Sequence, residues 1–194
     1  YGLTSEKFNH LCLLVFSRNA AGEITHEYID FFSNPGEAHD LLFTRSAWGD
    51  LLESNKFRGV KKIYIGGDAG AHFRGYKILY FNSFIYAKYG IMVESHFFAP
   101  HHGYSLCDSH GGQLRGMFRR AQAELGLGFT KASQLVKVVE DAVEDGLLHN
   151  TEAHVYKPLS DDKIYVDFPK KLPRPALVDK ALSGIRVCCS IKYA

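Results

Sequence analysis

Two apolar runs in this chain each lead into a glycine-rich segment that carries an aspartate. The run at 63–65 is followed by Asp68, and glycines stand at 66, 67 and 70. The run at 91–98 is followed by a loop in which Asp108 precedes the glycine pair 111–112. A carboxylate at the end of a buried strand needs a cation or hydrogen-bond donors, because burial penalises its charge. Two such carboxylates at neighbouring strand ends would suit a bound Mg²⁺ ion.

The size and composition fit one globular domain, or one domain with an appendage. The chain has 194 residues, of which 46% are hydrophobic and 23% charged, as is ordinary for a protein with a packed core. The net charge of +2 is too small to demand or exclude a polyanionic partner, since local patches matter more than the sum.

The spacing of the cysteines and the length of the apolar runs predict the kind of cellular compartment in which the protein occurs. Four cysteines occur, and none of their spacings resembles a secreted disulfide framework, so we expect a reducing compartment. No run of about 18 apolar residues occurs, so we expect no membrane span, and no signal peptide is visible. The sequence begins at Tyr1 rather than Met, which indicates a fragment or a processed product.

Short apolar runs alternate with segments of helical periodicity. A strand hairpin followed by strand–helix alternation predicts an α/β fold, with a mixed sheet and helices on both faces. We expect the core to span residues 1–127, and residues 128–194 to form a C-terminal α+β extension packed on it. Strands are predicted at 11–16, 24–32, 63–65, 91–98, 154–156, 164–168 and 185–191, and helices at 37–54, 73–88, from near Gly112 to 125, and 130–144.

This order of elements resembles the ribonuclease H-like fold of transposases and integrases with an Asp-Asp-Glu or Asp-Asp-Asp site. The closer resemblance is to eukaryotic transposon-derived proteins, in which a strand ends in Ser-Asp-Gly and His-Gly-Lys and Cys/Ala-Asp-Gly-x-Gly-Gly follow. The resemblance covers roughly residues 11–120. The matching segments are Gly67-Asp68-Ala69, His102-Gly103-Tyr104 and Cys107-Asp108-Ser109-His110-Gly111-Gly112.

The resemblance implies a metal-dependent nuclease site. Asp68 would be the second catalytic acid and Asp108 the third, holding Mg²⁺ (or Mn²⁺) for phosphodiester cleavage and strand transfer. In this fold the first acid lies on a strand before the hairpin, so here that strand either precedes Tyr1 or has been lost. The implied partners are DNA and a homo-oligomer or larger protein assembly, and the implied location is the nucleus.

Two departures from the family pattern favour an alternative. Tyr104 stands where the family usually has Lys, and Ser109 where it usually has Gly. The alternative is a transposon-derived module that no longer cuts and serves as a scaffold for nucleic acid or a protein partner. Asp68 and Asp108 could then simply cap the helices that follow them, since Asp is a preferred capping residue.

Basic residues flank both aspartates. Arg115 and Arg119 are four apart on the helix after Asp108, so they share a face that could meet DNA phosphates. The same role is open to the adjacent Arg120, and to Arg74 and Lys77 after Asp68. The alternative is an ordinary solvated basic face.

Histidines and a cysteine gather around Asp108. His102 or His110 could orient a phosphate or a water, although such a residue more often bonds loop backbone. Together with His101 and Cys107 they also offer ligand types for zinc. No second tight pair stands at a standard zinc spacing, and the family resemblance explains the cluster better.

Overall fold

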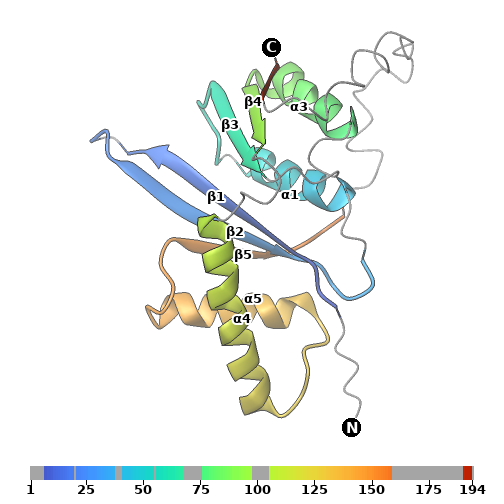
Figure 1. Cartoon of the computed structure of the whole chain (residues 1–194), viewed down its shortest axis with the longest axis vertical. Helices are drawn as coiled ribbons and strands as arrows, with labels where there is room; N and C mark the ends of the chain where they lie inside the picture. The colour runs from blue at the N-terminus through green and yellow to red at the C-terminus, as the bar shows by residue number, and fades with distance from the viewer. Residues whose placement is uncertain are drawn as a thin grey trace. The chain divides into compact units, whose positions relative to one another are not determined.

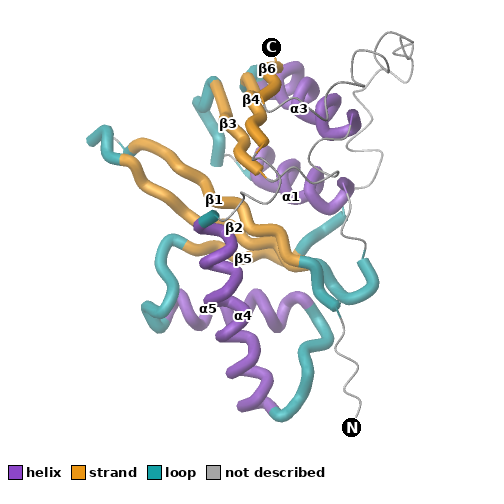
Figure 2. The backbone as a smooth tube through the Cα atoms, viewed as in Figure 1, coloured by secondary structure: helices purple, strands orange, loops and turns teal. Residues whose placement is uncertain are grey.

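The computed structural model shows a mixed α/β protein whose contacts divide into two compact units (Figures 1 and 2). Unit 1 comprises residues 1–39 and 104–157, and unit 2 comprises residues 40–103 and 158–194. The units interleave along the chain, whereas the sequence predicts one boundary at residue 127. The structure describes residues 7–19, 21–37, 41–54, 56–67, 76–97, 105–158 and 190–193, with backbone alone at 41, 76–80 and 190–193.

Unit 1 is built on a hairpin. Strand β1 (His10–Arg18) pairs antiparallel with β2 (Ile24–Phe32), and β5 (Thr151–Val155) pairs parallel with the other edge of β2. The turn between the hairpin strands has Gly22 at a φ of 82°, a left-handed conformation that suits glycine. The result is a small mixed sheet in the order β1-β2-β5.

Helices α4 (Leu106–Leu125) and α5 (Ala132–Glu144) lie on one side of this sheet (Figure 1). Strand residues alternate between faces, so Phe32 and its register partner Val155 point to the same side. That side meets the apolar stripe of each helix, because Phe32 packs in one cluster with Leu114 of α4 and Val139 of α5. The buried members of this core are Phe32, Leu114, Phe129, Ala132, Leu135, Val136, Val139, Ala142 and Leu148.

Unit 2 contains the second sheet. Strand β3 (Lys62–Gly67) pairs parallel with β4 (Met92–Phe97), which pairs antiparallel with β6 (Ser190–Tyr193). Helices α1 (Leu41–Glu53) and α3 (Tyr76–Tyr89) accompany it, and α3 contacts both α1 and β4. Buried apolar residues of this unit include Phe43, Ala47, Trp48, Leu51, Leu52, Phe81, Phe84, Ile85, Ile91 and Val93.

The pattern of apolar runs predicts most elements within a few residues, and β2 has the predicted bounds. One prediction is wrong: the helix expected from near Gly112 begins at Leu106, because Ser105 and Asp108 bond each other across its first turn. The described strands also form two sheets instead of one. The predicted strand at 164–168, and residues 185–189 of the last one, lie outside the described residues.

Among the described helices, none combines the length and the apolarity needed to cross a bilayer.

Two glycines of α4 predict opposite effects of the same substitution. Gly116 lies at an exposed position inside α4, and Gly126 caps the end of the helix at a φ of 64°. An added Cβ would contact nothing at either position. We expect Gly116→Ala to raise the free energy of unfolding by up to about 1 kcal/mol through helix propensity. Gly126→Ala should lower it by about 1 kcal/mol through left-handed strain. Urea denaturation measures both, and shifts of the same sign would contradict the assigned helix end.

Candidate functional site

Several residues predicted for the nuclease site are not placed by the structure. Asp68, Arg74 and His102 lie outside the described residues, and Lys77 is described as backbone within α3. Their predicted roles therefore stay predictions.

Asp108 lies in the first turn of α4, where it acts on its own helix. Its Oδ2 accepts hydrogen bonds from the Ser105 backbone N–H at 2.7 Å and from the Ser105 hydroxyl at 2.9 Å. A negative charge at this end also interacts favourably with the helix dipole. The N-cap itself is Ser105, and Asp108, predicted as the cap in the alternative, is its capping-box partner at the third helical position. A metal-binding role for the exposed Asp108 carboxylate stays a prediction.

The three predicted arginines of α4 are solvent-exposed. We call Arg115, Arg119 and Arg120 the arginine face, because they lie on a helix whose other side is buried through His110 and Leu114. No ion pair joins any of the three to a carboxylate in the described part of the chain. Their charges are therefore not neutralised by neighbours that the structure describes.

A cluster of titratable side chains in unit 1 surrounds Asp30, next to α4. Cys12 and Asp30 are register partners in the hairpin, so their side chains share one face, and His10 follows on that face two residues away. Helix α4 directs Cys107 and His110, three residues apart, toward the same place. We call these five residues (His10, Cys12, Asp30, Cys107 and His110) the Asp30 cluster.

The Asp30 carboxylate is completely buried and bonds two imidazoles. Nε2 of His10 lies 2.6 Å from Oδ1, and Nε2 of His110 lies 2.7 Å from Oδ2. Burial pushes the pKa of Asp30 upward, but the hydrogen bonds and charges of the two histidines outweigh burial, and the pKa lies below its ordinary value. Rings hold both imidazoles: Tyr28 stacks on His110 at 4.1 Å and Phe32 stacks on His10 at 4.8 Å.

The two thiols of the cluster, Cys12 and Cys107, differ in acidity. The hydrogen bond from Cys12 stabilises the Cys107 thiolate and lowers the pKa of Cys107 to about 7, against the effect of burial. The same bond, together with burial and the nearby Asp30 charge, raises the pKa of Cys12. Cys107 is therefore the more acidic and more reactive thiol of the two.

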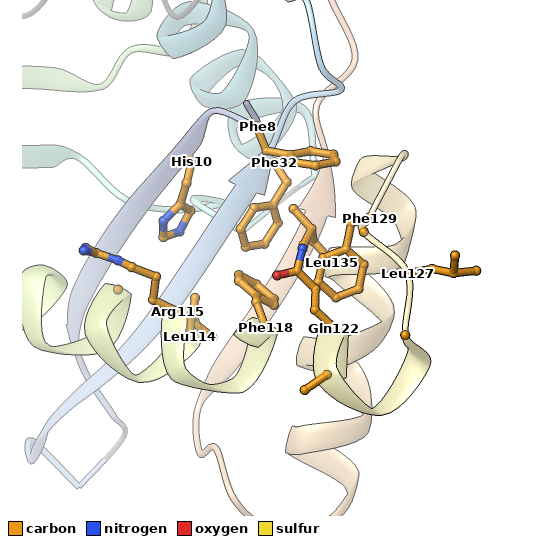
Figure 3. A pocket seen from close by; sticks show the side chains of 14 residues that line it. Phe8, His10, Phe32, Leu114, Arg115, Phe118, Gln122, Leu127, Phe129 and Leu135 are labelled. Atoms are coloured by element: carbon orange, nitrogen blue, oxygen red, sulfur yellow. The ribbon is translucent and has the colours of Figure 1, made fainter. Parts of the chain in front are cut away.

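A pocket of about 760 Å³ adjoins the cluster (Figure 3). Its walls are mainly apolar, with Phe32, Phe118 and Phe129 grouped together in the close view. The imidazole of His10 and the guanidinium of Arg115 lie at its other side. This pocket therefore borders both Arg115 of the arginine face and His10 of the Asp30 cluster.

One protein family accounts for most of the chain. The model of the family described as Domain of unknown function (DUF8701) matches residues 11–164. The chain belongs to this family. No curated protein and no solved structure matches it. The matched region holds Cys12, Asp30, Cys107 and His110, so four of the five residues of the Asp30 cluster lie within the family domain.

Sequence reasoning found two of the five residues of this cluster. The Cys-x-x-His spacing on α4 singled out Cys107 and His110, but His10, Cys12 and Asp30 were missed as their partners. The available signal was the setting of Asp30 between Ile29 and Phe31, because a charge inside an apolar strand needs buried partners. The identity of those partners depends on the hairpin register and on α4, which no local spacing encodes.

Removing the central charge should destabilise unit 1. We expect Asp30→Asn to lower the free energy of unfolding by about 2–4 kcal/mol, because two imidazoles, one of them buried, lose a charged acceptor. Asp141→Asn, which breaks the exposed pair with Lys137, should leave the denaturation midpoint nearly unchanged. Equal effects of the two substitutions would show that the Asp30 bonds contribute little.

The unequal thiols predict an order of alkylation. In chelator-treated, reduced protein, iodoacetamide should modify Cys107 before Cys12, and the Cys107 rate should rise as the pH passes through about 7. Peptide mapping by mass spectrometry assigns the modified residue. In urea both thiols should react alike, with the ordinary pKa near 8.5. Faster modification of Cys12 in the folded chain would reverse the assigned roles.

Proposed function

We propose that this chain is a DNA-handling module of transposon descent, with a ribonuclease H-like core, that binds nucleic acid through the arginine face of α4. The observation that carries the proposal is the set of three exposed arginines on a helix anchored by its other side. The resemblance of residues 67–69 and 102–112 to transposon-derived proteins supports the same reading.

The arginine face has the properties of a phosphate-binding surface. Arg115 and Arg119 are one helical turn apart, so both can contact the backbone of one nucleic-acid strand. Helix α4 is held by the burial of Leu114 in the core and of His110 against Asp30, so the backbone that carries the three arginines is fixed in position. Neutralising phosphates would release counterions, which makes binding favourable and sensitive to salt.

The apolar pocket supports a preference for unpaired strands. Arg115 belongs to the pocket wall, so a phosphate held by Arg115 would place a neighbouring base close to the partly exposed ring of Phe118. Bases released from a duplex gain from contact with aromatic rings, and this gain depends little on sequence. We therefore expect single-stranded DNA to bind more tightly than duplex DNA of the same length.

Phosphodiester cleavage and strand transfer form the second candidate function. The resemblance assigns Asp68 and Asp108 to a Mg²⁺ or Mn²⁺ site, and carboxylates are suitable ligands for such ions. Asp108, however, already accepts two hydrogen bonds from Ser105 through one oxygen. A module that binds DNA without cutting it can keep these hydrogen bonds of Asp108. For that reason we place DNA binding before cleavage.

Neutralising the arginine face should weaken DNA binding. In fluorescence anisotropy with a labelled single-stranded oligonucleotide, Arg115→Gln with Arg119→Gln should reduce the slope of log Kd against log salt concentration by about 1.4. Lys137→Gln with Lys157→Gln removes the same charge from exposed positions elsewhere in unit 1 and is the matched control. Equal losses in both double variants would mean that net charge, and no particular surface, attracts the DNA.

A nicking assay with Mg²⁺ separates the two candidate functions. A binding module should leave supercoiled DNA intact with or without the ion. An Asn side-chain oxygen can still accept the Ser105 backbone N–H, so Asp108→Asn removes the charge while keeping this bond of the capping box. Mg²⁺-dependent nicking that is lost in Asp108→Asn, with helicity unchanged by circular dichroism, would establish the enzyme in place of the binding module.

A further inference from the structure

We propose that the Asp30 cluster is a structural zinc site, in which Cys12, Asp30, Cys107 and His110 bind one Zn²⁺ ion. The site would join the hairpin of β1 and β2 to helix α4. It lies inside unit 1, and its ligands do not include the arginines of the proposed DNA-binding face.

The donor atoms are already close together. The Cys12 sulfur, an Asp30 carboxylate oxygen and a His110 ring nitrogen all lie within 4.8 Å of one another. Cys107 is three residues before His110 on α4, so it shares that side of the helix and is the candidate for the fourth ligand. Zinc–ligand bonds of about 2.0–2.3 Å place tetrahedral donors roughly 3.5 Å apart, so small side-chain shifts would suffice. The ion would replace the hydrogen bond between His110 and Asp30.

The donor types favour zinc over magnesium. Two thiolates and an imidazole are soft or borderline ligands, which select zinc and related transition metals, whereas Mg²⁺ prefers oxygen. Four protein ligands leave no open position for a substrate or a water, which is the pattern of a structural site. The burial of Asp30 and His110 fits this closed arrangement.

The surroundings of the cluster would orient the ligands. His10 bonds Oδ1 of Asp30, so the carboxylate keeps an oriented partner if Oδ2 turns to the metal. Tyr28 stacks on the His110 ring and restricts its rotation. Such outer contacts raise metal affinity by fixing the ligand atoms before the ion arrives.

The spacing of this site explains why a search along the sequence passes over it. Cys107 and His110 form one tight pair on α4. The second pair, Cys12 and Asp30, is formed across two strands by the hairpin register. A site made from one helical pair and one cross-strand pair has no second short spacing to detect.

Cobalt titration of the whole chain tests the proposal. Reduced protein freed of metal by a chelator should take up one equivalent of Co²⁺ and show thiolate-to-cobalt charge-transfer absorption, which Zn²⁺ then abolishes. Zinc should also raise the melting temperature. Absence of uptake, a cobalt spectrum without thiolate bands, or an intramolecular Cys12–Cys107 disulfide in protein that takes up no metal would overturn the proposal.

Variants separate coordination from a general loss of folding. Cys12→Ser and Cys107→Ser should each lose the thiolate band in part and the pair together entirely, while Cys188→Ser with Cys189→Ser should keep it. His10→Gln should keep the band and weaken cobalt binding by about 10–100-fold, because it changes an outer contact. Circular dichroism in the absence of metal verifies that each variant is folded. A folded Cys12→Ser, Cys107→Ser double variant with an unchanged spectrum would place the metal elsewhere.

Discussion

The buried Asp30 carboxylate is the constraint on which unit 1 depends. A charge with no exposure to solvent is costly unless donors surround it, and here the donors come from β1 and from α4. Apolar packing alone would tolerate small sliding of the helix over the sheet, whereas two hydrogen bonds to one carboxylate do not. A slip of one residue in the hairpin would also turn Asp30 to the face occupied by Ile29 and Phe31, where these histidines could not reach it.

The same anchoring determines what α4 presents to solvent. His110 and Leu114 are four residues apart and both buried, so they fix the rotation of the helix about its axis. With that rotation fixed, Arg115, Arg119 and Arg120 must lie on the exposed side. A polar interaction in the interior thus specifies a basic surface outside it, and the two features belong to one helix because its periodicity separates them.

The sequence predicts the elements of this fold better than their association. Apolar alternation is a local property, so β2 is predicted with its observed bounds. The predicted start of α4 is wrong because Gly111 and Gly112 indicate a loop when only their neighbours in the sequence are considered. In the structure, α4 is capped at Ser105 and packs on the sheet, so it includes both glycines. The site is less predictable still, because the bond between His110 and Asp30 joins residues 80 positions apart.

The segment that resembles transposon-derived proteins also has a structural role in unit 1. In the run from Cys107 to His110, Asp108 completes the capping box with Ser105 and His110 bonds the buried Asp30. Both residues therefore contribute to the structure of unit 1 whether or not DNA is ever cut. It follows that this run gives only weak support for catalysis, because the same residues already have structural partners.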